Sequence, residues 1–169
     1  SAWSIGKSGI GYSDDDDSTQ ISQTLSLYMQ YAFDITDPSE VNNAALYMDY
    51  DDGFIAYLNG TEIARSSNMG QYGEIFNYDD PSLSGREAIM YNGNAPEYFN
   101  ATDHVDQLQV GENILTVEVH NVSIGSSDMS SIPFFLLGFS SVQDEFEVGN
   151  KYVVVNNIYP HTNFKIASE

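Results

Sequence analysis

Apolar and polar side chains alternate along residues 25–35, and no other feature of the sequence restricts the fold as strongly. The odd positions of this run, LSLYMQYAFDI, are apolar or aromatic, and the even positions are mostly polar or small. Successive side chains of a β-strand point to opposite faces, so this period of two is typical of a long strand with one face on a core. We therefore expect a protein built from β-sheets.

Shorter runs of the same kind predict further strands at residues 44–50, 54–58, 61–65, 113–121, 134–139 and 151–159. Asn59 and Gly60 separate two of these runs and predict a type I′ hairpin, because both central residues of that turn need positive φ. Residues 66–104 have no sustained period, so we expect a long loop there with a short helix at 84–90. The sequence thus predicts strands joined by turns, with little helix.

The length of 169 residues fits one domain, and we expect a single β-sandwich domain over residues 1–169. The acidic excess could indicate disorder, but aromatic residues make up 13% of the chain and favour packed sheets. Strands separated by turn-rich segments indicate an all-β, antiparallel β-sandwich. The long connections favour a jelly roll, with an immunoglobulin-like sandwich as the alternative.

Acidic residues outnumber basic ones by 25 to 5, which gives a formal net charge of -20. Such a chain repels phosphate backbones and anionic headgroups, so we expect neither nucleic acid nor a membrane as a partner. The absence of cysteine excludes disulfides, thiolate metal sites and cysteine nucleophiles. Calcium and neutral ligands remain as binding partners, and we expect a monomer.

Two acidic clusters are candidate calcium sites, because calcium takes roughly six to eight oxygen ligands. The candidate ligands are Asp14, Asp15, Asp16, Asp17, Thr19, Asp51 and Asp52. A solvated acidic loop is the alternative for the first cluster. The second cluster does not follow the EF-hand spacing, and its alternative is a tight turn whose carboxylates cap backbone amides.

Tyrosine and asparagine are interleaved in the irregular segment and suit a neutral glycan. Aromatic rings stack on the apolar face of a sugar, while amides bind its hydroxyl groups. The candidate sugar ligands are Tyr72, Tyr78, Tyr91, Asn92, Asn94 and Tyr98. The alternative is that these rings cover the edge of the sandwich.

Residues suited to catalysis do not gather into a recognisable group. The histidines, His104, His120 and His161, are scattered along the chain. Glu118 and His120 share one face of a predicted strand, and we interpret them as a packed pair rather than an acid–base pair. No pair of carboxylates stands out as that of a glycosidase. We therefore expect no enzyme activity.

Four segments together resemble galactose-binding-domain-like jelly-roll modules. They are residues 3–12 with the acidic run behind them, 46–65 (LYMDYDDGFIAYLNGTEIAR), 111–121 (GENILTVEVHN) and 126–129 (SSDM). The resemblance implies a jelly roll, a structural calcium near the start of the sandwich, and a place in a large secreted bacterial protein. Residues 51–60 are also locally similar to the calcium-dependent sugar site of PA14-type adhesin domains, which implies a metal role for Asp51 and Asp52.

These observations predict a non-catalytic carbohydrate-binding module, secreted and extracellular, with structural calcium. It would bind a neutral or calcium-bridged polysaccharide and would target an attached enzyme, in neighbouring domains of the same chain, to that polysaccharide. The alternative is a calcium-stabilised structural or adhesive spacer of a surface protein that binds no sugar. A hydrolase with an unrecognised carboxylate pair is the third hypothesis.

Overall fold

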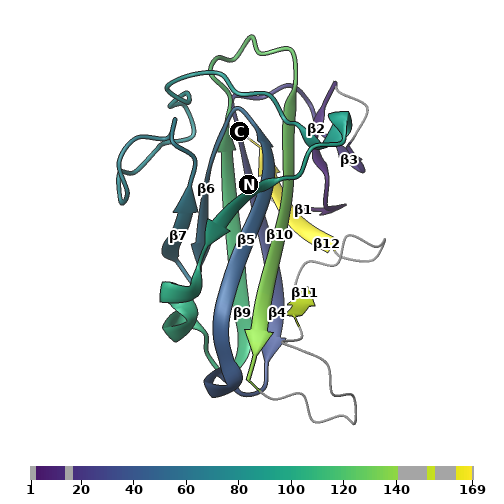
Figure 1. Cartoon of the computed structure of the whole chain (residues 1–169). Helices are drawn as coiled ribbons and strands as arrows, with labels where there is room; N and C mark the ends of the chain where they lie inside the picture. Colours follow the sequence, from purple (N-terminus) through teal and green to yellow (C-terminus); the bar gives the residue numbers. More distant parts are fainter. Residues whose placement is uncertain (1–2, 14–16, 141–151, 155–162, 169) are drawn as a thin grey trace.

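The computed structural model describes residues 3–13, 17–140, 152–154 and 163–168, and these form two β-sheets packed face to face (Figure 1). Sheet A contains, in spatial order, β1 (Ser4–Lys7), β12 (Asn163–Ser168), β4 (Ser26–Ile35), β9 (Gly111–His120), β6 (Gly53–Leu58) and β7 (Thr61–Arg65). Sheet B contains β3 (Thr19–Gln20), β2 (Ile10–Tyr12), β10 (Met129–Phe139), β5 (Val41–Asp51) and β8 (Glu97–Asn100), and β11 (Tyr152–Val154) pairs with β10. Short 3-10 helices lie at η1 (Pro38–Glu40), η2 (Met90–Asn92) and η3 (Thr102–Gln107).

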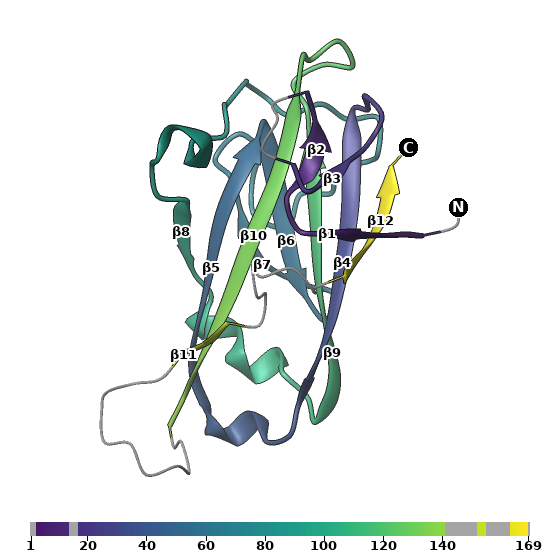
Figure 2. The same ribbon diagram turned by 90° about the vertical axis from the view of Figure 1, so that its right-hand side faces the viewer.

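The strand order is that of a jelly roll. From β3 to β10 the chain passes between the sheets at each connection except the β6–β7 hairpin, and β3 pairs in parallel with β2 in the same sheet. The result is a four-stranded layer β4-β9-β6-β7 facing a layer β2-β10-β5-β8. Figure 2 shows β8, β5 and β10 side by side in the second layer. The predicted jelly roll is confirmed, and the immunoglobulin-like alternative is not the observed topology.

The hydrophobic core lies between the two sheets. The alternation predicted for residues 25–35 is confirmed in β4, where Leu27 and Met29 are fully buried and Ser26 begins the strand. Both sheets contribute large, fully buried side chains to this core: Leu27, Met29, Phe54, Leu58 and Leu115 from sheet A, and Ile10, Leu46, Met48 and Phe135 from sheet B. Burial of each such side chain contributes about 1.5–3 kcal/mol.

The predicted hairpin is confirmed. Asn59 and Gly60 connect β6 to β7 with φ values of 51° and 85°, as a type I′ turn requires. The Asn59 side chain also accepts a hydrogen bond from the Ile114 amide at 2.8 Å and donates one to Asn113 Oδ1 at 2.8 Å. The turn is thereby attached to β9, the neighbour of β6 in sheet A.

The prediction of a short helix at residues 84–90 is wrong. This segment is irregular, because its backbone amides bind carboxylates of β5 and the residue that follows β5 instead of carbonyls one turn back. Ile89 and Met90 donate to Asp49, and Arg86 donates to Asp52. Of the strand predicted at 151–159, the described part is β11, and the rest lies outside the described residues. Within the described part of the chain, no helix is long and apolar enough to cross a membrane.

Candidate functional site

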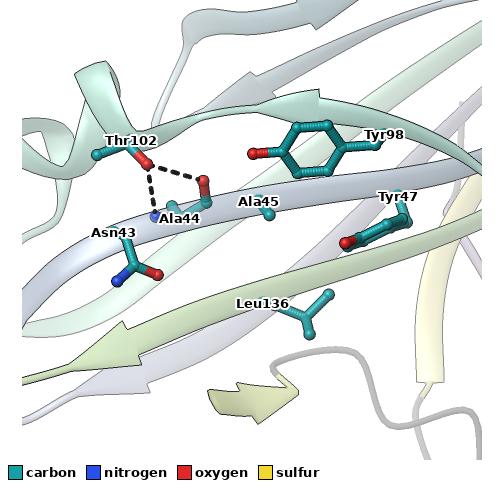
Figure 3. Close-up of a pocket in the computed structure, with 7 residues that line it drawn as sticks. All are labelled: Asn43, Ala44, Ala45, Tyr47, Tyr98, Thr102 and Leu136. Carbon is teal, nitrogen blue, oxygen red and sulfur yellow. Dashed lines mark hydrogen bonds between the residues drawn. The ribbon is translucent and has the colours of Figure 1, made fainter. Parts of the chain in front are cut away.

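A cleft of about 500 Å³ lies on the outer face of sheet B (Figure 3). From Ala44 onward the even-numbered apolar residues of β5, Ala44, Leu46 and Met48, face the core, so Asn43, Ala45 and Tyr47 face outward. The cleft is lined by uncharged residues of β5, β8, β10 and η3: Asn43, Ala44, Ala45, Tyr47, Tyr98, Thr102 and Leu136. Ala45 pairs with Leu136 across the sheet, and these two side chains form an apolar floor.

Two tyrosines form one wall of the cleft. Tyr47 of β5 pairs directly with Tyr98 of β8, and their ring centroids are 5.2 Å apart with an interplanar angle of 55°. Tyr98 is 55% exposed, so its ring remains open to a ligand. Both side chains extend towards the end of the cleft where Asn43 and Thr102 lie (Figure 3). The wall can therefore stack on an apolar ligand face while the phenol groups reach its polar edge.

The end of the cleft that contains Asn43 and Thr102 is polar. The Thr102 hydroxyl accepts a hydrogen bond from the Ala44 amide and donates one to the Ala44 carbonyl, both at 3.3 Å. Asn43 donates from Nδ2 to Asn42 Oδ1 at 2.7 Å, which orients its amide group. The cleft thus combines an aromatic wall, an apolar floor and neutral hydrogen-bonding groups at one end.

A second candidate site lies at the other end of β5. Asp51, Glu87 and Asp128 place one carboxylate oxygen each within 4.8 Å of one another. Asp51 is buried at the end of β5, Asp128 is half-buried directly before β10, and Glu87 is exposed. Burial raises the pKa of the nearby Tyr12 phenol, and the negative charges of Asp128 and Asp51 raise it further. This concentration of negative charge suits a divalent cation.

Strand register brings Asp17 of the first acidic cluster towards the same place. Gly11 of β2 pairs with Ser130 of β10, and Ser130 pairs with Asp51 of β5, so all three face outward in one row. The Asp17 carboxylate lies over Gly11, because a Cβ atom on Gly11 would stand 2.7 Å from both of its oxygens. Ser130 lies between Gly11 and Asp51 in this row, and its Oγ atom is buried and has no hydrogen-bond partner among the described residues. We call Asp51, Glu87, Asp128 and Ser130 the acidic site. The Asp17 carboxylate lies over Gly11, in the neighbouring strand, and is not one of the three carboxylates that come within 4.8 Å of one another.

The other predicted calcium ligands do not join the acidic site. Both carboxylate oxygens of Asp52 bind backbone amides, Oδ1 that of Arg86 at 2.8 Å and Oδ2 that of Val122 at 2.7 Å. This is the amide-capping arrangement that was the alternative for the second cluster. The Thr19 hydroxyl bonds the backbone of Lys7. Asp14, Asp15 and Asp16 lie outside the described residues.

Among the predicted sugar ligands, the structure places Tyr98 alone in the cleft. Tyr72 donates its hydroxyl proton to the Glu62 carbonyl of β7 at 2.6 Å, and the Tyr78 carbonyl accepts a hydrogen bond from the Ser26 hydroxyl at the start of β4. The remaining candidates, Tyr91, Asn92 and Asn94, are exposed at η2 and directly after it, on the opposite side of the molecule in Figure 1. Sequence reasoning missed Tyr47, whose outward position in β5 was readable from the alternation.

The structure places Glu118 and His120 close together on one face of β9. His120 Nε2 lies 3.9 Å from Glu118 Oε2, and both side chains are buried. His120 Nδ1 is 2.8 Å from the Asp80 carbonyl, and Glu118 accepts a hydrogen bond from the Tyr57 hydroxyl at 2.8 Å. The pair therefore connects β9 to β6 and to the segment 66–80.

The chain resembles parts of α-L-rhamnosidases. The structure superposes on that of the Streptomyces avermitilis enzyme complexed with L-rhamnose with a TM-score of 0.50 and 16% identity, over 88% of this chain and 11% of that one. The enzymes from Dictyoglumus thermophilum and Aspergillus terreus also give TM-scores of 0.50, with 14% and 13% identity, over 99% of this chain and 16% of theirs. At these identities the likeness concerns the fold alone.

The chain corresponds to a small part of each of these enzymes. No protein-family model matches its sequence, and no curated protein is significantly similar to it. The resemblance to galactose-binding-domain-like modules is supported as far as the sheet-rich jelly-roll fold. The comparisons connect this fold with large carbohydrate-active enzymes.

Proposed function

We propose that this protein is a non-catalytic carbohydrate-binding module that targets an attached enzyme to an extracellular polysaccharide. The observation that carries the proposal is the cleft with its Tyr47–Tyr98 wall. A pyranose ring has an apolar face that stacks on aromatic rings and a rim of hydroxyl groups that bind amides and hydroxyls. The cleft offers both kinds of group within one uncharged surface.

The charge of the protein supports a neutral ligand. The residues that line the cleft are uncharged, while the chain carries a formal net charge of -20. An anionic polysaccharide would be repelled by this surface unless a divalent cation stood between them. We therefore propose a neutral polysaccharide, with a calcium-bridged acidic one as the second ligand class.

The structural neighbours support a role beside a carbohydrate-active enzyme. They are α-L-rhamnosidases, and this chain covers between 11% and 16% of their length. A domain of this size and fold in such enzymes supports the role of an accessory module next to a catalytic domain. Secretion follows in the same proposal, because a polysaccharide-binding module acts where the polymer is. Rhamnose-containing glycans belong in the first set of ligands to be tested.

Calcium at the acidic site is the second part of the proposal. The site provides oxygen atoms only, which suits a hard cation, and Asp51, Glu87 and Asp128 would supply the negative charge. The buried Ser130 hydroxyl, which has no hydrogen-bond partner among the described residues, suits a further oxygen ligand. A bound ion would join the end of β5, the segment around Glu87 and the start of β10, and would stabilise this end of the sandwich.

A glycan array tests the binding function. It contains neutral glucans, mannans, galactans and rhamnose-containing oligosaccharides, and it is read with calcium and with EDTA. We expect the wild type to bind at least one neutral glycan, and Tyr98→Ala to bind that glycan roughly tenfold or more weakly, because a lost stacking ring costs about 1.5 kcal/mol or more. No binding by the wild type, or unchanged binding by Tyr98→Ala, contradicts the proposal.

The alternative function is a calcium-stabilised spacer that binds no sugar. The acidic site favours it, because one ion there would tie together three segments that are distant in sequence. A spacer gains thermal stability with calcium but not with any glycan. A rise in melting temperature with calcium alone, together with an empty glycan array, would favour the spacer over the binding module.

A further inference from the structure

A glycine on the outer face of β10 makes room for an amide of the cleft. Gly138 pairs directly with Asn43 of β5. A Cβ atom on Gly138 would stand 2.3 Å from Asn43 Oδ1 and 2.6 Å from Asn43 Nδ2. Carbon cannot approach these atoms so closely, so any larger residue at position 138 would displace the Asn43 amide.

The backbone does not require glycine at position 138. Gly138 is not among the described glycines with positive φ, so its conformation is open to any residue. A β-bulge follows it, between Gly138 and Phe139, but the bulge type that needs glycine has its glycine in the left-handed region. Glycine inside a strand is unfavourable relative to alanine. Glycine at position 138 is explained by the Asn43 side chain, which occupies the space that a Cβ atom would need.

Asn43 is held in a defined orientation on this glycine. Its Nδ2 donates to Asn42 Oδ1 at 2.7 Å, so Oδ1 and the second proton of Nδ2 are the groups that a ligand can use. Thr102 lies at the same end of the cleft, and the phenol groups of Tyr47 and Tyr98 point towards it (Figure 3). An oriented amide can accept a hydrogen bond from one sugar hydroxyl and donate one to its neighbour.

We propose that Asn43 determines which sugar stereoisomer the cleft prefers, by binding two neighbouring ring hydroxyls, and that Gly138 is its positioning residue. The inference rests on the proposed carbohydrate-binding function. Stacking on Tyr47 and Tyr98 tolerates many pyranoses, because each has an apolar face. A fixed amide discriminates more sharply, because a hydroxyl in the wrong configuration leaves it without a partner. Selectivity therefore lies at the Asn43 end of the cleft, and affinity lies mainly in the tyrosine wall.

The test compares β-1,3-linked hexasaccharides of glucose, mannose and galactose by calorimetric titration, since mannose differs from glucose at the C2 hydroxyl and galactose differs from glucose at the C4 hydroxyl, and this linkage leaves both hydroxyls free. We expect the wild type to prefer one of them. Asn43→Ala lowers this preference by roughly three- to tenfold, the effect of one lost hydrogen bond. Gly138→Ala has the same effect, and the double variant loses no more than either single variant, because the glycine acts through the amide.

Gly125→Ala is the matched control, since a Cβ atom there meets nothing closer than Ser123 Oγ at 3.8 Å. We expect it to bind like the wild type. Additive losses in the double variant, or an unchanged preference in Asn43→Ala, overturn the inference. If Tyr98→Ala abolishes binding while Asn43→Ala leaves the preference intact, the inference fails and the proposed function stands. Equal binding of the three hexasaccharides by the wild type contradicts stereochemical selection, and binding of none removes the proposed function as well.

Discussion

The backbone amide of Val122 donates a hydrogen bond to Asp52 Oδ2 at 2.7 Å, although the two residues lie 70 positions apart in the sequence. Asp52 is 4% exposed, and its other oxygen binds the Arg86 amide. One buried carboxylate therefore ties two loops to the start of β6. Its neighbour Asp51 points instead into the acidic site, so adjacent aspartates have different roles.

This difference predicts that substitutions of the two aspartates respond differently to calcium. Asp52→Asn replaces an oxygen that accepts a backbone proton with a donor, and we expect a loss of about 2–3 kcal/mol in the free energy of unfolding, with or without calcium. Asp51→Asn removes a charge from the acidic site, so we expect this variant to lose the stabilisation by calcium that is proposed for the wild type. Urea denaturation in calcium and in EDTA measures both. Equal calcium stabilisation of Asp51→Asn and the wild type would contradict calcium binding by Asp51.

We expect Tyr47 and Tyr72 to differ in their contribution to glycan binding. Tyr47→Ala is expected to weaken binding of a neutral glycan roughly tenfold, because it removes half of the aromatic wall. Tyr72→Ala is the matched control, since Tyr72 is 62% exposed but lies outside the cleft. Affinity electrophoresis in a gel containing the bound polysaccharide measures both variants. A larger loss with Tyr72→Ala than with Tyr47→Ala would place the binding surface in the segment 66–80.

Alkaline pH is expected to destabilise the protein through Tyr57. Burial raises the pKa of the Tyr57 phenol, and its hydrogen bond to Glu118 raises it further. Unfolded tyrosine ionises near pH 10, while Tyr57 in the folded protein keeps its proton, so the unfolded state binds fewer protons above that pH. The free energy of unfolding therefore falls by up to about 1.4 kcal/mol per pH unit for this residue.

Tyr57→Phe isolates this contribution. The variant is less stable at neutral pH by about 1–2 kcal/mol, because Glu118 loses a donor. Above pH 10 its stability falls less steeply than that of the wild type, although Tyr50, whose pKa burial also raises, still contributes. Urea denaturation at a series of pH values gives both slopes. Identical slopes would show that Tyr57 does not titrate differently in the two states.

Arg65 and Glu62 form a buried ion pair that holds the segment after β7. Arg65 Nε lies 2.6 Å from Glu62 Oε1, and each side chain is 7% exposed. Arg65 also donates to the Met69 and Glu74 carbonyls, and Glu62 accepts a hydrogen bond from the Gly73 amide. Arg65→Met leaves the Glu62 carboxylate buried without its cation, and we expect a loss of about 3–5 kcal/mol.

Arg65→Lys keeps the charge but not the planar group that binds two carboxylate oxygens at once, so we expect an intermediate loss. Denaturation midpoints rank the variants, and hydrogen exchange of residues 69–76 reports whether the segment loosens. An Arg65→Met protein as stable as the wild type would mean that the pair contributes nothing net to folding.

Predictions from the sequence succeeded where they depended on neighbouring residues. The alternation in residues 25–35 identified β4, and Asn59-Gly60 identified the β6–β7 turn, because strand periodicity and turn conformation are local properties. The helix predicted at 84–90 failed for a nonlocal reason. Asp49 and Asp52 bind the backbone amides of this segment, and nothing in its own composition shows that they do so.

In the candidate sites, too, the sequence predicted suitable residue types but not the contacts between distant residues. Sequence composition singled out Tyr98, Asp17 and Asp51 as residue types suited to sugar or calcium. It could not pair Tyr98 with Tyr47, because the register between β5 and β8 is set by the packing of the whole sheet. In the same way, it could not bring Asp51 together with Glu87 and Asp128, which lie far from it in the sequence.

The sequence by itself determined the class of fold, the main strands and the acidic, cysteine-free surface chemistry, because these follow from local periodicity and composition. Tertiary structure decided which side chains meet. Asp51 faces the acidic site while Asp52 binds backbone amides, and Tyr98 lines the cleft while Tyr72 does not. The physical reason is that strands distant in the chain become neighbours in a jelly roll, and their register then selects each contact.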